Sequence, residues 1–100
     1  MTPVCLVDTA LVTALGEGTD AVWDRLLAGA TGIDRVPHFE TTSYVSDVAA
    51  CVPGLRPGRS GSRLDDLLAR TLAQLQAVPR DARLFLATTK GAVDVLERWR

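Results

Sequence analysis

Short apolar runs alternate along the chain with segments rich in glycine, proline and polar residues. Three of these runs, at residues 4–15, 44–52 and 84–87, are predicted to form strands. The first is expected to be a strand followed by an apolar loop, and it lacks a clean alternation of apolar and polar positions. The last is apolar throughout. Both features are typical of strands that are covered on both faces.

The helical spacing of apolar residues predicts a first helix between Thr19 and Gly29. Thr19 is a suitable N-cap, Asp20 lies favourably in the first turn, and a glycine such as Gly29 commonly ends a helix. The apolar face of this helix consists of Val22, Trp23, Leu26 and Leu27.

A second helix is predicted to start at Ser62, because Asp65 follows three residues later in an arrangement close to a capping box. Its leucines recur at a spacing of three to four, at positions 64, 67, 68, 72 and 75, and Pro79 prevents its continuation. A third helix is predicted over residues 92–99. Its inward-facing residues are Val93, Leu96 and Trp99.

The segments between these elements, residues 30–43, 53–61 and 88–91, are predicted to be loops and turns. The resulting order of strand and helix, repeated three times, predicts an α/β fold with a mixed or partly parallel sheet and helices packed on it. Three strands make a narrow sheet, and the last helix has neither a C′ glycine nor a return strand after it. We therefore expect residues 1–100 to be an incomplete piece, the opening of a larger α/β domain.

The composition narrows the function classes. The chain has 100 residues, a formal net charge of −1 and 47% hydrophobic residues, which excludes a disordered chain and a basic surface for nucleic acid. Asp8 interrupts the apolar start, so neither a signal peptide nor a membrane span is expected. Cys5 and Cys51 are interpreted as free core thiols in a reducing cytoplasm, with a single disulfide between them as the alternative. One histidine and no Cys/His cluster argue against a zinc site, and no metal is expected.

Residues 16–21 match the relaxed dinucleotide fingerprint G-x-G-x-x-G/A between a strand and a helix. Glu17 and Asp20 would place two negative charges beside the pyrophosphate, which opposes the electrostatics of such a site. Ordinary loop glycines at Gly16 and Gly18 ahead of a helix are therefore the preferred explanation, and no cofactor is expected.

Nucleophilic catalysis requires an activated thiol or hydroxyl, and His38 is the single possible imidazole base. No orienting partner for His38 is visible in the sequence. The turn at residues 88–91 lies where open α/β sheets place ligands, but it lacks a complete phosphate-binding loop. Trp23 and Trp99 fit helix-core positions. The basic residues Arg56, Arg59 and Arg63 could meet an acidic partner or remain solvated loop charges.

Several stretches, taken together, resemble the N-terminal part of β-ketoacyl synthases. Residues 11–19 are similar to that family's apolar-Leu-Gly turn, and residues 22–33 to its Trp-containing helix, Leu-Leu-Ala-Gly end and Thr-Gly-Ile turn. Residues 39–41, 48–52, 62–65 and 84–91 are similar to later family segments in the same order. Ala10 replaces a usual glycine and His38 a usual arginine, which indicates a divergent branch.

The resemblance implies a thiolase-like fold, a homodimer or ketosynthase-like heterodimer, and a decarboxylative condensation of acyl and malonyl thioesters on an acyl carrier protein in fatty-acid or polyketide synthesis. The family's catalytic cysteine and histidines come later in the chain, so no catalytic role passes to Cys5, Cys51 or His38. Two alternatives stay open: a non-catalytic ketosynthase-like partner subunit, and a small nucleotide-binding module that uses Gly16 and Gly18.

Overall fold

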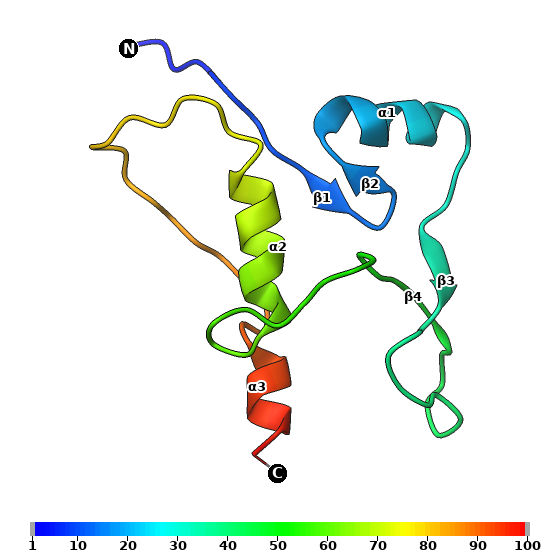
Figure 1. The fold of residues 1–100 in the computed structure, drawn as a ribbon. Helices are drawn as coiled ribbons and strands as arrows, with labels where there is room; N and C mark the ends of the chain where they lie inside the picture. Colours follow the sequence, from blue (N-terminus) through cyan, green and yellow to red (C-terminus); the bar gives the residue numbers. More distant parts are fainter. Residues whose placement is uncertain (1, 100) are drawn as a thin grey trace. The chain divides into compact units, whose positions relative to one another are not determined.

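A computed structural model describes residues 2–99, which divide into two compact units. One unit is Leu11–Gly54, and the other combines the described residues of Met1–Ala10 and Leu55–Arg100. Within residues 2–99, four short strands and three helices make up the regular structure; Figure 1 shows their order along the chain. No helix within residues 2–99 has both the length and the apolar composition needed to cross a membrane.

The unit Leu11–Gly54 begins with a tight hairpin and a helix. Strands β1 (Val12–Thr13) and β2 (Gly16–Glu17) pair antiparallel, and the Gly18 N–H closes the hairpin by donating to the Leu11 carbonyl at 2.8 Å. Helix α1 (Thr19–Leu27) follows directly, with Gly18 at φ 91° as its N-cap. The predicted helix is confirmed, whereas the predicted cap at Thr19 is wrong by one residue.

Gly29 ends α1 as a C′ glycine, as predicted, and the end of the helix is a Schellman motif. The Gly29 N–H donates to the Leu26 carbonyl and the Ala30 N–H to the Arg25 carbonyl, both at 3.0 Å. Gly29 has φ 72°, a left-handed conformation that side chains with a Cβ rarely adopt. The sequence therefore ends this helix by its own local chemistry.

Strands β3 (Ile33–Arg35) and β4 (Val48–Ala50) form the second ladder, in which Asp34 is paired with Ala49. The pairing is antiparallel. Residues 30–43 were expected to be loop throughout and residues 44–52 to be one strand, so both predictions are wrong in extent. A three-residue strand is too short for periodicity to detect, because its hydrogen bonds depend on a partner that lies far away in the sequence.

Helices α2 (Arg63–Leu72) and α3 (Val93–Glu97) form the regular part of the other unit. Ser62 caps α2 as predicted, since its Oγ accepts the Leu64 N–H at 3.1 Å. The predicted capping box is not completed: the Asp65 carboxylate accepts from the Ser60 N–H and hydroxyl instead of from the Ser62 N–H. Helix α2 ends at Leu72, before the last predicted leucine at position 75.

The two outer apolar runs, residues 4–7 and 84–87, have no strand partner within residues 2–99 and are exposed. The strands predicted there are absent from residues 2–99, and both observed ladders are antiparallel where a partly parallel sheet was expected. Val93, Leu96 and Trp99 of the third helix are exposed and do not face inward. The thiolase-like fold stays a prediction.

Burial is correspondingly sparse. Within residues 2–99, Val22 is the one buried hydrophobic residue and Ser62 the one buried polar residue. Trp23 is 59% exposed and Trp99 87%, so neither forms part of a core, contrary to prediction. Most of the apolar side chains of this sequence are therefore uncovered.

Candidate functional site

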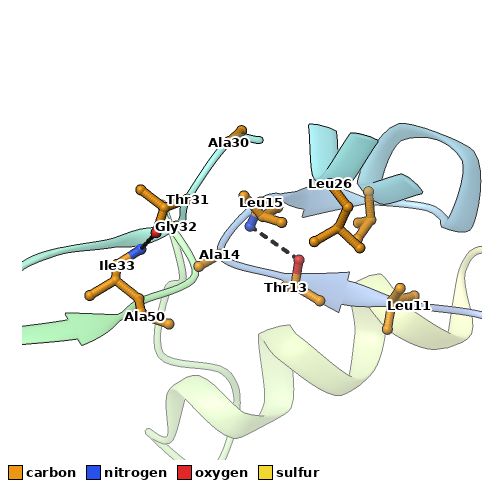
Figure 2. A pocket seen from close by; sticks show the side chains of 11 residues that line it. Leu11, Thr13, Ala14, Leu15, Leu26, Ala30, Thr31, Gly32, Ile33 and Ala50 are labelled. Atoms are coloured by element: carbon orange, nitrogen blue, oxygen red, sulfur yellow. Dashed lines mark hydrogen bonds between the residues drawn. The ribbon is translucent and has the colours of Figure 1, made fainter. Parts of the chain in front are cut away.

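The most distinct concavity is an apolar hollow of about 480 Å³ within the unit Leu11–Gly54. It is built from one face of α1, the β1–β2 hairpin and the start of β3 (Figure 2). Val22 is its buried floor residue, while Leu26 remains 53% exposed at its side. Its other lining residues are Leu11, Thr13, Ala14, Leu15, Ala30, Thr31, Gly32, Ile33 and Ala50.

Gly32 brings the hairpin and the β3 segment together in this hollow. A Cβ added at Gly32 would lie 2.6 Å from the Ala14 Cβ and 3.0 Å from the Ala14 carbonyl carbon. Real Cβ atoms do not approach other atoms so closely, so the side chain of any other residue would push the two segments apart. The Thr-Gly-Ile turn of the sequence thus has a physical reason for its glycine.

Two threonine hydroxyls are the polar side chains of the hollow, and each is already used in a local turn. Thr13 Oγ1 accepts the Leu15 N–H at 3.1 Å, and Thr31 Oγ1 accepts the Ile33 N–H at 3.2 Å (Figure 2). No charged residue, thiol or imidazole lines the hollow. Its chemistry is therefore that of an apolar binding or packing surface, without an acid, a base or an activated nucleophile.

A smaller hollow of about 320 Å³ is lined by two residues that sequence analysis did not place together. His38, which follows β3, and Cys51, which follows β4, both line it, together with Asp34 and Arg35. The antiparallel β3–β4 pairing causes this proximity. No hydrogen bond joins the imidazole to the thiol in the described part of the chain, so the pair lacks the geometry of an activated nucleophile.

The cysteines differ from the prediction of two core thiols. Cys5 is exposed and Cys51 is half-buried, and both are free, so the alternative of a disulfide is not realised. Residues 2–99 hold no group of three or more His, Cys, Asp or Glu side chains that could bind a metal ion.

The glycines of the dinucleotide-like pattern have structural roles in the hairpin. Gly16 at φ 148° lies in β2 and Gly18 caps α1, so the hairpin stands where the fingerprint requires a tight strand-to-helix turn. Glu17 lies in β2, and Asp20 in the first turn of α1. The geometry therefore gives a dinucleotide no support.

The turn at residues 88–91 differs from the predicted ligand-binding position. The Gly91 N–H donates to Thr88 Oγ1 at 3.1 Å, just before α3. Residues 84–87, directly before this turn, form no strand, so the prediction that the turn lies at the carboxyl end of a central strand is wrong. It is a local cap-like turn.

A polar cluster at the start of α2 was not predicted as a unit. Asp94 of α3 accepts the Ser62 hydroxyl at 2.6 Å and the Arg63 N–H at 2.8 Å, and the Arg63 Nε lies 3.7 Å from the same carboxylate. The pKa of Asp94 lies below its usual value, first because of the Ser62 hydroxyl and then because of the Arg63 N–H, while desolvation opposes this. Arg98 of the same segment donates to the Gly61 carbonyl.

The cluster is structural. An N-cap serine and a carboxylate at the end of a helix dipole stabilise one another without any base that could remove the serine proton. The cap was readable from the sequence, but Asp94 lies 32 positions further on and its involvement has no local signal. A second carboxylate, Asp66, accepts the Arg56 N–H at 2.9 Å and pairs with Arg70 at 2.9 Å.

Of the basic residues Arg56, Arg59 and Arg63, the structure pairs one side chain with a carboxylate, and an acidic partner for this group stays a prediction. The Arg63 side chain pairs with Asp94, the backbone N–H of Arg56 donates to Asp66, and Arg59 is exposed.

Comparison with known proteins finds a distant relationship. No protein-family model matches the chain, and no solved structure matches it. Over 70 residues the chain is 29% identical to a 3-oxoacyl-[acyl-carrier-protein] synthase I, chloroplastic, from Hordeum vulgare. The match includes 65% of this chain and spans 15% of the length of that relative.

Proposed function

We propose that this chain is the N-terminal segment of a β-ketoacyl-[acyl carrier protein] synthase-like protein. The observation that carries the proposal is the 29% identity to the barley synthase over 70 residues. It is supported by the Trp-containing helix and the Thr-Gly-Ile turn at residues 22–33, whose structure gives physical roles to Gly29 and Gly32.

In this proposal the segment contributes scaffold. Condensation needs a thiolate that takes the acyl group and donors that stabilise the enolate oxygen formed on decarboxylation. None of the described side chains is arranged for either task. The thiol, the imidazoles, the acyl carrier protein, the acyl and malonyl thioesters and the dimer all belong to the proposed whole protein. In that whole protein, α1 and the segments around it would support the active site structurally and would take no direct part in the reaction.

An exchange of segments tests the proposal. In the barley synthase, the stretch corresponding to residues 22–33 is replaced by these twelve residues, and condensation of an acyl unit with malonyl-acyl carrier protein is measured. A matched control carries the same twelve residues in scrambled order. We expect the chimera to keep product formation within about tenfold of the parent and the scrambled control to lose it. A chimera as inactive as the scrambled control would contradict the proposal.

A further inference from the structure

Helix α3 is too short to be stable on its own. It spans five residues, and Ala92 at its N-cap has no polar side chain that could bind the first N–H groups. Isolated helices of fewer than about 12 residues are marginal in water, so α3 depends on contacts with another element. Its apolar side chains give limited support, because Val93 and Leu96 are exposed and Val95 is half-buried.

Helix α3 lies at the start of α2 (Figure 1), and one carboxylate makes most of the contact. Asp94 accepts the Ser62 hydroxyl at 2.6 Å and the Arg63 N–H at 2.8 Å, and the Arg63 Nε lies 3.7 Å away. One turn later, Arg98 donates to the Gly61 carbonyl. Gly61 has φ 81° and leaves room for this guanidinium, because an added Cβ would lie 2.7 Å from the Arg98 Nη2. Two points one helical turn apart therefore hold α3 to the segment that begins α2.

Helix α2 has bonds of its own that do not involve α3. It is ten residues long, and its N-cap Ser62 accepts the Leu64 N–H at 3.1 Å. On its surface Arg70 pairs with Asp66, four residues earlier, at 2.9 Å. The dependence is therefore one-sided: α3 requires the start of α2, whereas α2 can persist without α3.

We propose that residues 93–99 form a strap that closes on the start of α2 through Asp94 and opens as one unit while α2 remains folded. Opening uncovers the Ser62 hydroxyl, which is fully buried in the closed state, together with the Arg63 N–H. Segments with few buried apolar side chains are the ones that open locally in folded proteins. The strap involves α2 and α3 alone and is independent of the proposed function.

Amide hydrogen exchange followed by NMR on the 100-residue chain tests the strap with three reporters. The Arg63 N–H reports on the contact with Asp94, and the Arg98 and Trp99 N–H groups report on the hydrogen bonds of α3. Opening as one unit gives all three N–H groups the same opening equilibrium. Fraying of α3 alone would speed exchange at Arg98 and Trp99 and leave Arg63 protected.

Asp94→Asn removes the carboxylate at nearly constant size, and Glu97→Gln removes a carboxylate from an exposed position of the same helix as the matched control. The asparagine side chain has one oxygen acceptor where aspartate has two, so it cannot reproduce both bonds to Ser62 and Arg63. We expect Asp94→Asn to speed exchange of all three reporters by the same factor of at least about tenfold, and to leave the last turn of α2 within about twofold. Glu97→Gln should leave every reporter within about twofold, and an equal acceleration by both variants would overturn the inference.

Val95→Ala separates the carboxylate from apolar packing. Because Val95 is half-buried, its truncation should speed exchange of the reporters less than Asp94→Asn does. Four further results would overturn the inference. These are unchanged reporters in Asp94→Asn, an equal acceleration in the last turn of α2, an Arg63 N–H that stays protected while Arg98 and Trp99 exchange, and an effect of Val95→Ala as large as that of Asp94→Asn.

Discussion

Replacing Ser62 with alanine tests the most heavily bonded point of the α2–α3 unit. The Ser62 hydroxyl is fully buried, accepts the Leu64 N–H at 3.1 Å and donates to the Asp94 carboxylate at 2.6 Å. Alanine removes both bonds. It leaves one N–H at the start of α2 without its cap, and it removes the main cause of the lowered pKa of Asp94.

The size of the effect follows from the capping bond. Loss of a serine N-cap costs about 1 kcal/mol, within a range of about 0.5–2 kcal/mol. One kcal/mol changes an opening equilibrium about fivefold. Amide exchange in the first turn of α2 should therefore be about fivefold faster in Ser62→Ala. Helix α1 lies in the other unit and serves as the internal reference.

Hydrogen exchange followed by NMR measures this change residue by residue. Ser43→Ala is the matched control, because Ser43 is an exposed turn residue of the other unit. Ser62→Asp separates the two bonds: aspartate caps a helix as well as serine, but it sets a second carboxylate against Asp94. This variant should keep α2 protected and release α3. Unchanged exchange in α2 of Ser62→Ala, or an equal change in α1, would refute the reasoning.

Three further predictions concern acid pH and two glycines. The pKa values of Asp94 and Asp66 are lowered in the folded chain, so their contribution to stability is complete above the usual value of 3.8 and is lost as the pH falls through the folded values. An acid titration of helicity should therefore be flat above about pH 5 and decline below pH 3.8, and a decline centred near neutrality would contradict it. Gly29→Ala should destabilise the end of α1 by about 1–2 kcal/mol, because the left-handed conformation disfavours a Cβ. Gly29→Asn should destabilise it less. Amide exchange at the end of α1 should therefore be faster in Gly29→Ala than in Gly29→Asn. Gly32→Ala should loosen the hollow by clashing with Ala14, seen as lost contacts between the hairpin and β3 in NMR spectra.

The helices could be predicted because their signals are local. Leucines at a spacing of three to four, the Ser62 cap and the Gly29 stop each act within one turn of the chain, and the structure confirms them. The incomplete capping box shows the limit of such signals. Asp65 turns to Ser60 because the preceding turn offers it two donors.

The strands could not be predicted equally well, because a strand is defined by its partner. Residues 84–87 have a strand-like composition but no ladder, while β3 has a weak pattern and a well-paired register with β4. The proximity of His38 and Cys51 in one hollow follows from that same register. No property of either residue's neighbours in the sequence indicates it.

Part of the apolar hollow could be predicted from the sequence and part of it could not. The α1 face with Val22 and Leu26 was predictable from helical spacing, and the Thr-Gly-Ile turn was recognisable as a family-like feature. The close approach of Gly32 to Ala14 was not, because it joins two segments that are eighteen positions apart.

Calorimetry of the isolated chain tests most directly the claim that residues 2–99 bury too little apolar surface to form a cooperative core by themselves. A self-sufficient domain of about 100 residues unfolds with an enthalpy of about 60–80 kcal/mol. We predict a broad transition with a much smaller enthalpy that depends on protein concentration. A sharp, concentration-independent transition of a monomer with the full enthalpy would contradict the account.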